Sequence, residues 1–208
     1  MKRISKIVSD LDLSSLDRFI GMSCSAINTE LELGVELSSK SFARSIISKM
    51  IEKTGTSIDS QKYDYKMIRV DQLGYAKNPS PFKVTDYYKI LNEEWETSEF
   101  KQLLKLTYIF FVVTHGSPET SIFKGYVIHD FTDEEMDSAK IVWLDTQDKI
   151  RNGIYDRFLT DKDTGTFFFK IHAASVTSQT SVPGGGNEPF RSFWISRKLI
   201  SSIVSHVC

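Results

Sequence analysis

Cysteine is scarce in this chain, and long apolar runs are absent. Its two cysteines, Cys24 and Cys208, lie far apart and leave neither a zinc-ligand spacing nor a disulfide framework. Residues 1–13 are basic but lack the hydrophobic core of a signal peptide, and the longest apolar stretch, residues 108–113, is too short to cross a bilayer. We therefore expect a soluble, cytoplasmic protein with reduced thiols and no membrane contact.

An excess of positive charge is missing as well. The chain has 26 Lys and Arg against 27 Asp and Glu, for a net charge of -1. If the protein binds nucleic acid, it must therefore do so through a local basic patch, because its net charge is too small to attract phosphates over the whole surface. With 208 residues, 40% of them hydrophobic, the chain can form one large domain with a sizeable core. We expect a single domain over residues 1–208, in which residues 1–13 form a loose amino-terminal segment.

The order of the predicted elements indicates an α/β domain with a mixed β-sheet flanked by helices. Residues 78–81 are expected to form a loop, because their two prolines argue against a place inside a sheet, and polar, glycine-rich residues 173–189 are expected to form another. Apolar periodicity predicts helices over residues 14–32, 38–54, 133–153 and 198–207, and β-rich runs predict strands over 63–70, 121–130, 166–172, 193–195 and the end of 101–113.

An acid and a lysine stand two apart on the first predicted strand. Asp64 and Lys66 should project from the same face, because side chains alternate along a strand. A metal-dependent nuclease needs this relation: carboxylates hold a divalent metal, and the lysine orients or activates water beside the phosphate. Asp59 could supply a second carboxylate from the preceding turn, and Glu52 ends a predicted helix nearby. The alternative is a solvated ion pair on an exposed strand edge.

Candidate contacts to DNA lie in two other segments. The polar loop after residue 173 is flanked by Lys170, His172 and Arg191, and its Ser, Thr and Gln side chains could meet base edges or phosphates. Lys101 and Lys105 stand four apart on a predicted helix face and could touch phosphates. A disordered surface loop and a solvated helix face are the alternatives for these two segments.

Several blocks of the sequence resemble the MutH superfamily, which contains a mismatch-repair nicking endonuclease and restriction endonucleases that cut at GATC. The resemblance runs from about residue 15 onward. It is carried by Phe19-Ile20-Gly21-Met22-Ser23, Ser39-Lys40-Ser41-Phe42, Lys66-Met67-Ile68-Arg69-Val70, Asn92-Glu93-Glu94-Trp95-Glu96-Thr97-Ser98-Glu99-Phe100, Phe110-Phe111-Val112-Val113, Ile122-Phe123-Lys124-Gly125 and Ser192-Phe193-Trp194-Ile195.

This resemblance implies a restriction-endonuclease-like core that clasps double-stranded DNA and uses Mg²⁺ to hydrolyse phosphodiesters. Lys66 falls on the family's catalytic lysine, and Asp64 falls on the acid two residues before it. Asp59 and Asp64 would be the metal ligands. Lys170 and His172 fall where the family has a basic stretch before its DNA-reading loop. A homodimer, or a place as a partner domain in a longer restriction enzyme, is also implied.

Two hypotheses follow from the resemblance. The first is a Mg²⁺-dependent restriction or nicking endonuclease, for which the resemblance implies GATC as the site, and Asp64 with Lys66 favours it. The second is a catalytically silent DNA-binding copy of the same fold, of the kind found in two-domain restriction enzymes. Ser57 at the position of the family's first acid and Leu103 at its second lysine favour that copy. The sequence-based prediction is the endonuclease, with the silent DNA-binding domain as the alternative.

Overall fold

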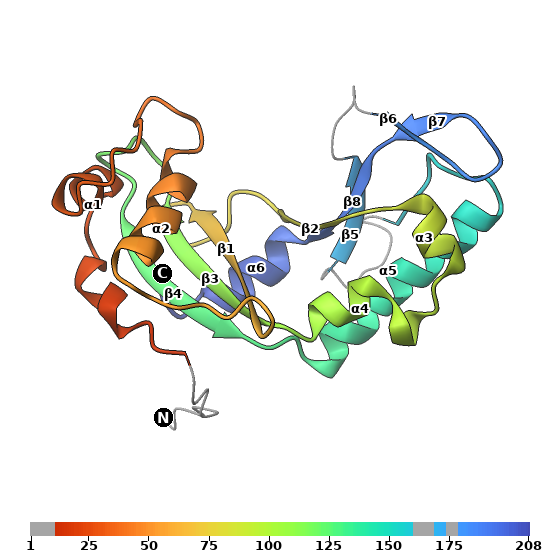
Figure 1. The fold of residues 1–208 in the computed structure, drawn as a ribbon, viewed down its shortest axis with the longest axis horizontal. Helices are drawn as coiled ribbons and strands as arrows, with labels where there is room; N and C mark the ends of the chain where they lie inside the picture. Colours follow the sequence, from red (N-terminus) through yellow and green to blue (C-terminus); the bar gives the residue numbers. More distant parts are fainter. Residues whose placement is uncertain (1–10, 160–168, 174–178) are drawn as a thin grey trace.

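A three-stranded mixed sheet forms one end of an arc-shaped molecule (Figure 1). The computed structural model describes residues 11–159, 169–173 and 179–208. Its elements are η1 (Ser14–Phe19), α1 (Cys24–Glu30), α2 (Phe42–Lys53), β1 (Tyr63–Val70), β2 (Ser80–Val84), α3 (Tyr87–Asn92), η2 (Trp95–Thr97), α4 (Glu99–Leu104), β3 (Thr107–Thr114), β4 (Phe123–His129), α5 (Asp133–Arg151), β5 (Phe169–Ala173), β6 (Gln179–Ser181), β7 (Asn187–Pro189), β8 (Arg191–Ile195) and α6 (Arg197–Val204).

The first sheet has the order β1-β3-β4, so that β1 lies at its edge. β1 runs parallel to β3, and β3 runs antiparallel to β4. The register places Asp64 beside Tyr108 and Lys66 beside Phe110. The fold is therefore mixed α/β with a mixed sheet, as the element order predicts.

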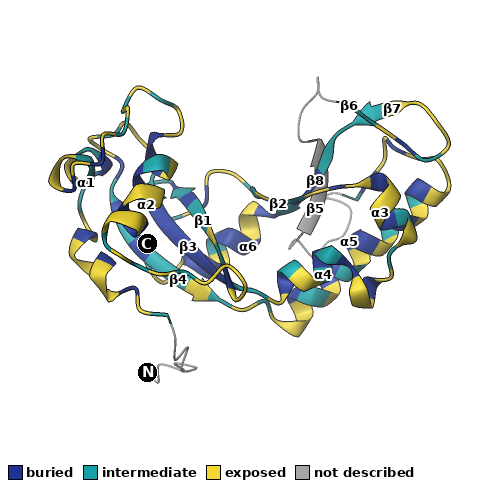
Figure 2. Cartoon of the chain, in the orientation of Figure 1, coloured by how far each residue is buried: buried dark blue, intermediate teal, exposed yellow. Residues whose placement is uncertain are grey.

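Both faces of this sheet are buried, which explains the continuous apolar run on β3. Ile109, Phe111 and Val113 pack on one face in a cluster with α1 and α2. Phe110 and Val112 alternate with them and pack on the other face with α6. Figure 2 shows β3 dark blue along its length, between helices whose outer sides are exposed. The sheet is thus flanked by helices on both sides.

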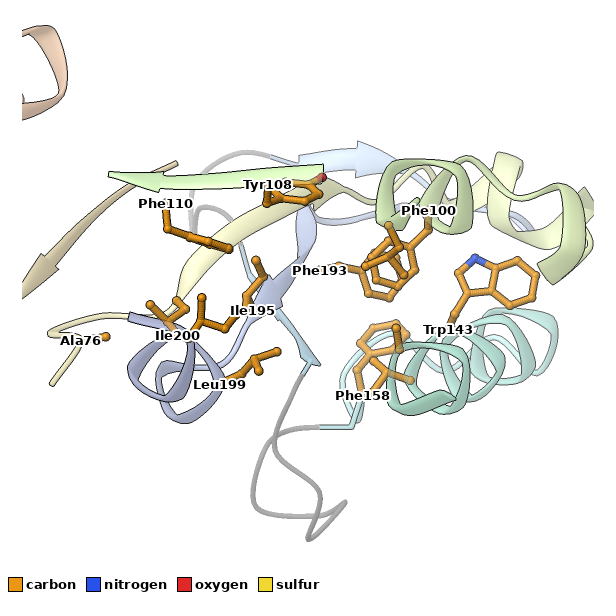
Figure 3. Close-up of a cluster of buried hydrophobic side chains, with 14 of the residues drawn as sticks. Ala76, Phe100, Tyr108, Phe110, Trp143, Phe158, Phe193, Ile195, Leu199 and Ile200 are labelled. Carbon is orange, nitrogen blue, oxygen red and sulfur yellow. The ribbon is translucent and has the colours of Figure 1, made fainter. Parts of the chain in front are cut away.

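The other end of the arc holds a second sheet, β2-β8-β5, a β6–β7 hairpin, and helices α3 to α5 (Figure 1). Aromatic rings fill the space between these elements (Figure 3). Phe100 from α4 stacks on Phe193 from β8 with ring centroids 4.2 Å apart, and Trp143 from α5 packs beside Trp95 at 5.7 Å. This cluster continues into the cluster on the α6 face of the first sheet, so one core joins the two ends.

The clearest sequence signals are confirmed. The strand predicted over residues 63–70 is β1, and the helix predicted over 133–153 is α5. A capping box explains the start of α5: Thr132 accepts a hydrogen bond from the Glu135 N–H, while the Glu135 side chain accepts one from the Thr132 N–H. Among the described residues, no helix combines the length and apolarity needed to span a membrane.

Three predicted elements are wrong in detail. The helix expected over residues 14–32 is split into η1 and α1 around Gly21, whose φ is +88° and whose N–H donates to the Phe123 carbonyl of β4. The loop expected at 78–81 runs into β2, where Pro81 is tolerated because β2 is an edge strand with a register shift after that proline. The loop expected at 173–189 contains β6 and β7, which form a hairpin.

Candidate nucleic-acid interface at the edge of strand β1

Asp64 and Lys66 form an ion pair on the face of β1 that also carries Ile68. The Lys66 Nζ lies 3.5 Å from the Asp64 Oδ2. The two side chains differ in exposure: Lys66 retains 13% of its side-chain surface, whereas Asp64 retains 42%. The other Asp64 oxygen, Oδ1, accepts a hydrogen bond from the Tyr65 N–H at 2.8 Å. The spacing on the strand therefore brings the acid and the lysine together, as the alternation predicts.

The Lys66 side chain lies among aromatic rings. Its Nζ is 5.4 Å from the centroid of Phe82 and 5.6 Å from that of Tyr108, within the range of cation–π attraction. Burial lowers the pKa of Lys66, and the neighbouring Asp64 carboxylate only partly offsets this. Burial, followed by the charge of Asp64, raises the pKa of Tyr108. Lys66 is thus a desolvated amine with one partly solvated partner.

A hollow of about 450 Å³ opens beside this pair, and we call it the strand-edge hollow. Asp64 and Lys66 line it from β1, Arg44 and Ser48 from α2, and Ser80 from the start of β2. The hollow exists because β1 is an edge strand: in the described part of the chain, β3 pairs with it along one side only. Residues 76 and 77 cover the other side only at its end, through a bridge from Ala76 to Val70.

A second hollow of about 250 Å³, which we call the helix-start hollow, adjoins the first. Arg44 and Ser80 line both, so the two form one continuous surface. The polar wall of the helix-start hollow also contains Lys40, Ser41, Arg69 and Asn78, and its remaining wall is made by Met67, Ile68, Pro79 and Pro81. None of these lining residues is acidic.

The resemblance implies that Asp59 and Asp64 together hold Mg²⁺, but only one of these two carboxylates lines the strand-edge hollow. Asp64 lines it, but Asp59 does not. The exposed Asp59 caps its own turn, where Oδ1 accepts from the Gln61 N–H at 2.9 Å. Among the described residues, no group of three His, Cys, Asp or Glu is placed to hold a metal ion. These donors do not fit a two-carboxylate centre, and Mg²⁺ remains a prediction. Glu52, on the exposed last turn of α2, lines neither hollow.

The other predicted DNA contacts lie away from these hollows. Lys101, on α4, pairs with Glu96 and lies 5.9 Å from the Trp95 ring centroid. It lines a different depression together with Asp133 and Asp137 on α5, where acids would repel a phosphate. Lys105 is exposed at the end of α4, near the side-chain oxygen of Gln102. The geometry does not group either lysine with Lys66.

Arg191 has partners inside the protein. Its Nε donates to the Tyr155 carbonyl at 3.1 Å, and its guanidinium lies 4.9 Å over the Phe158 ring. Lys170 and His172 occupy backbone positions on β5, opposite Trp194 and Ser192 of β8. Their side chains, and residues 174–178 of the loop predicted over 173–189, lie outside the described residues.

The basic residues of the two hollows are absent from the sequence-based set, except for Lys66. Lys40 precedes α2, Arg44 lies on α2 and Arg69 lies on β1, and only the tertiary fold brings the three together. One signal could have found two of them. The segment from Leu37 to Ile51 contains three cations and no acid, in a chain whose charges are nearly balanced.

No protein-family model matches the chain, and a search of curated proteins finds no match.

Proposed function

We propose that this domain binds double-stranded DNA along the edge of β1 and does not cut it. The observation that carries the proposal is the charge of the surface formed by the two hollows. Lys40, Arg44, Lys66 and Arg69 line it, against the single carboxylate of Asp64. Such a local excess of positive charge is what a protein of net charge -1 needs in order to attract a phosphate backbone.

A restriction-endonuclease-like core is the finer form of this proposal. The mixed sheet with α2 on one face and α6 on the other supports it, as does the acid–lysine pair on an edge strand. The positions of the carboxylates favour a DNA-binding domain without catalytic activity over an endonuclease. Asp59 caps its own turn, and Ser57 stands where the family resemblance expects an acid. The Asp64–Lys66 pair then lines the binding surface without holding a metal.

Binding and cleavage are tested together on one substrate. Purified protein is mixed with a duplex that contains GATC and with a matched duplex that lacks it, at several salt concentrations, and binding is followed by fluorescence anisotropy. Plasmid DNA is incubated in parallel with Mg²⁺ or Mn²⁺. We expect salt-sensitive binding and intact plasmid, because the surface offers cations to phosphates but one carboxylate to a metal.

The outcomes separate the two hypotheses made from the sequence. Nicked or linear plasmid that disappears with Lys66→Ala would establish the endonuclease and overturn the silent assignment. No binding to either duplex at low salt would overturn DNA binding itself. A preference for the GATC duplex would support the resemblance, whereas equal binding would limit the function to backbone recognition.

A further inference from the structure

We infer that the helix-start hollow binds a backbone phosphate, with Arg44 and Lys40 as its exposed cations and Arg69 as the cation held by internal contacts. The inference rests on the proposed function and names the chemical group that this part of the surface takes. It concerns residues other than the acid–lysine pair. It places phosphate contacts beside β1, in addition to those predicted from the sequence for Lys101 and Lys105.

The chemistry of the wall points to an anion. Every side chain with a polar group in the wall can donate hydrogen bonds: Lys40, Ser41, Arg44, Arg69, Asn78 and Ser80. Among the described residues no carboxylate lines the hollow, so no acidic side chain there competes with a phosphate for these donors. Three cations without a carboxylate to balance them suit the negative charge of a phosphate better than a neutral base edge, and they would repel a metal cation. A phosphate oxygen needs only donors.

The three cations are held in different ways. Arg69 is braced: one of its terminal nitrogens donates to the Lys40 carbonyl at 2.9 Å, and its guanidinium lies 5.5 Å from the Phe42 ring centroid. A guanidinium has five N–H donors, so this one bond orients it without exhausting it. Arg44 and Lys40 are exposed at the start of α2 and can adjust to a ligand. A fixed cation beside two adjustable ones lowers the ordering cost of binding.

The position of Arg44 favours a phosphate that is part of a nucleic-acid backbone over an isolated phosphate ion. Arg44 lines both hollows, and the strand-edge hollow carries the cation Lys66 with Asp64. An isolated phosphate would occupy the helix-start hollow alone. A nucleic-acid backbone can follow the continuous surface and meet Arg44 between its two parts. Such a contact positions the duplex without reading its sequence.

The test compares Arg44→Gln with Lys53→Gln in the complete protein. Both residues are on α2, but they are nine positions apart, which places them on opposite faces of the helix. Binding of a GATC duplex and of a matched non-GATC duplex is measured against salt concentration. We expect Arg44→Gln to weaken both duplexes roughly tenfold, as loss of one charged hydrogen bond predicts, and to reduce the salt slope by about 0.9. Lys53→Gln should leave both quantities unchanged.

A second probe identifies the source of the phosphate. Inorganic phosphate is titrated against wild-type protein and Arg44→Gln without DNA. Wild-type binding to DNA with an unchanged affinity in Arg44→Gln would overturn the inference and leave the proposed function standing. Tight, Arg44-dependent binding of inorganic phosphate together with Arg44-independent DNA binding would assign the hollow to a free anion and also overturn it. Failure of wild type to bind any duplex would instead remove the proposed function.

Discussion

Lys66 and Asp64 lie on the same face of β1, with the lysine Nζ 3.5 Å from the Asp64 Oδ2, yet they occupy different environments. The lysine is mostly covered by aromatic rings, whereas the carboxylate remains partly in water. The buried lysine has the Asp64 carboxylate as its neighbouring opposite charge. This asymmetry leads to a different expectation for each substitution: a change in DNA binding for Asp64 and a change in stability for Lys66.

Asp64→Asn should tighten DNA binding. Among the described residues, Asp64 is the one carboxylate that lines the two hollows, and the substitution removes its repulsion of an approaching phosphate. We expect a few-fold gain in affinity at low salt that fades as salt screens the charge. Asp59→Asn is the matched control, because it removes the same charge from a residue outside both hollows. Equal gains for both variants in an anisotropy titration would show that only net charge matters.

Lys66→Met should stabilise the protein at neutral pH. Burial lowers the pKa of Lys66 below the ordinary lysine value of 10.5, so the unfolded chain binds this proton more tightly than the native protein. Wild-type stability should therefore rise with pH between the lowered native pKa and 10.5, and the variant should lack that rise. Methionine keeps an apolar stem among the rings and leaves behind a carboxylate that is 42% exposed, so we expect the free energy of unfolding to rise at neutral pH.

Thermal unfolding across neutral to alkaline pH measures this effect. The stability difference between Lys66→Met and wild type should shrink as the pH approaches 10.5. Lys105→Met is the control, since Lys105 is exposed and its substitution removes a charge without relieving burial. A variant that is less stable than wild type at every pH would mean that the ion pair with Asp64 outweighs the burial cost.

The order of the elements could be predicted from the sequence because local patterns determine most of it. Alternation along residues 63–70 and the acidic, amphipathic run from Asp133 correspond to β1 and α5. The errors arise where contacts with residues far away in the sequence determine the local structure. Gly21 interrupts a helical pattern because its N–H pairs with Phe123, more than a hundred residues later, and Pro81 sits in a strand only because β2 is an edge.

The candidate site could be predicted only in part for the same reason. Asp64 and Lys66 are two apart, so strand geometry alone brings them together. Arg44 and Arg69 converge on one hollow through the packing of α2 beside β1, which no local pattern encodes. Conversely, Lys101 has a sequence pattern typical of a phosphate contact but meets Glu96 and the acids of α5. Charge alone does not distinguish a surface cation with a ligand from one with an internal partner.

Gln147→Leu should destabilise the fold. The buried Gln147 side chain of α5 donates to the carbonyls of Ile90 and Glu93, both at 2.7 Å, and so satisfies the end of α3. Leucine fills a similar volume but leaves both carbonyls without these donors, at a cost of roughly 2–4 kcal/mol. Chemical denaturation measures the loss. Gln102→Leu is the control, because Gln102 is exposed and its side chain makes only long contacts, 3.4 Å to the Glu96 carbonyl and 3.5 Å to the Lys105 Nζ. An equal loss of stability in that variant would show that burial of the glutamine is not the cause.

Glu135→Gln should remove part of the acid sensitivity of the protein. Burial acts to raise the pKa of Glu135, but hydrogen bonds with His129 and with the Thr132 N–H outweigh it and hold the pKa below 4.5. The carboxylate therefore contributes stability that is fully present above 4.5 and is lost as the pH falls through the lower native pKa. Glutamine can retain the capping box but does not titrate. Unfolding measured from neutral pH into acid should show a flatter dependence for Glu135→Gln than for wild type. The control is Glu134→Gln at the exposed neighbouring residue, and its stability should depend on pH as in wild type. The same pH dependence in all three proteins would rule out Glu135 as the source of the acid sensitivity.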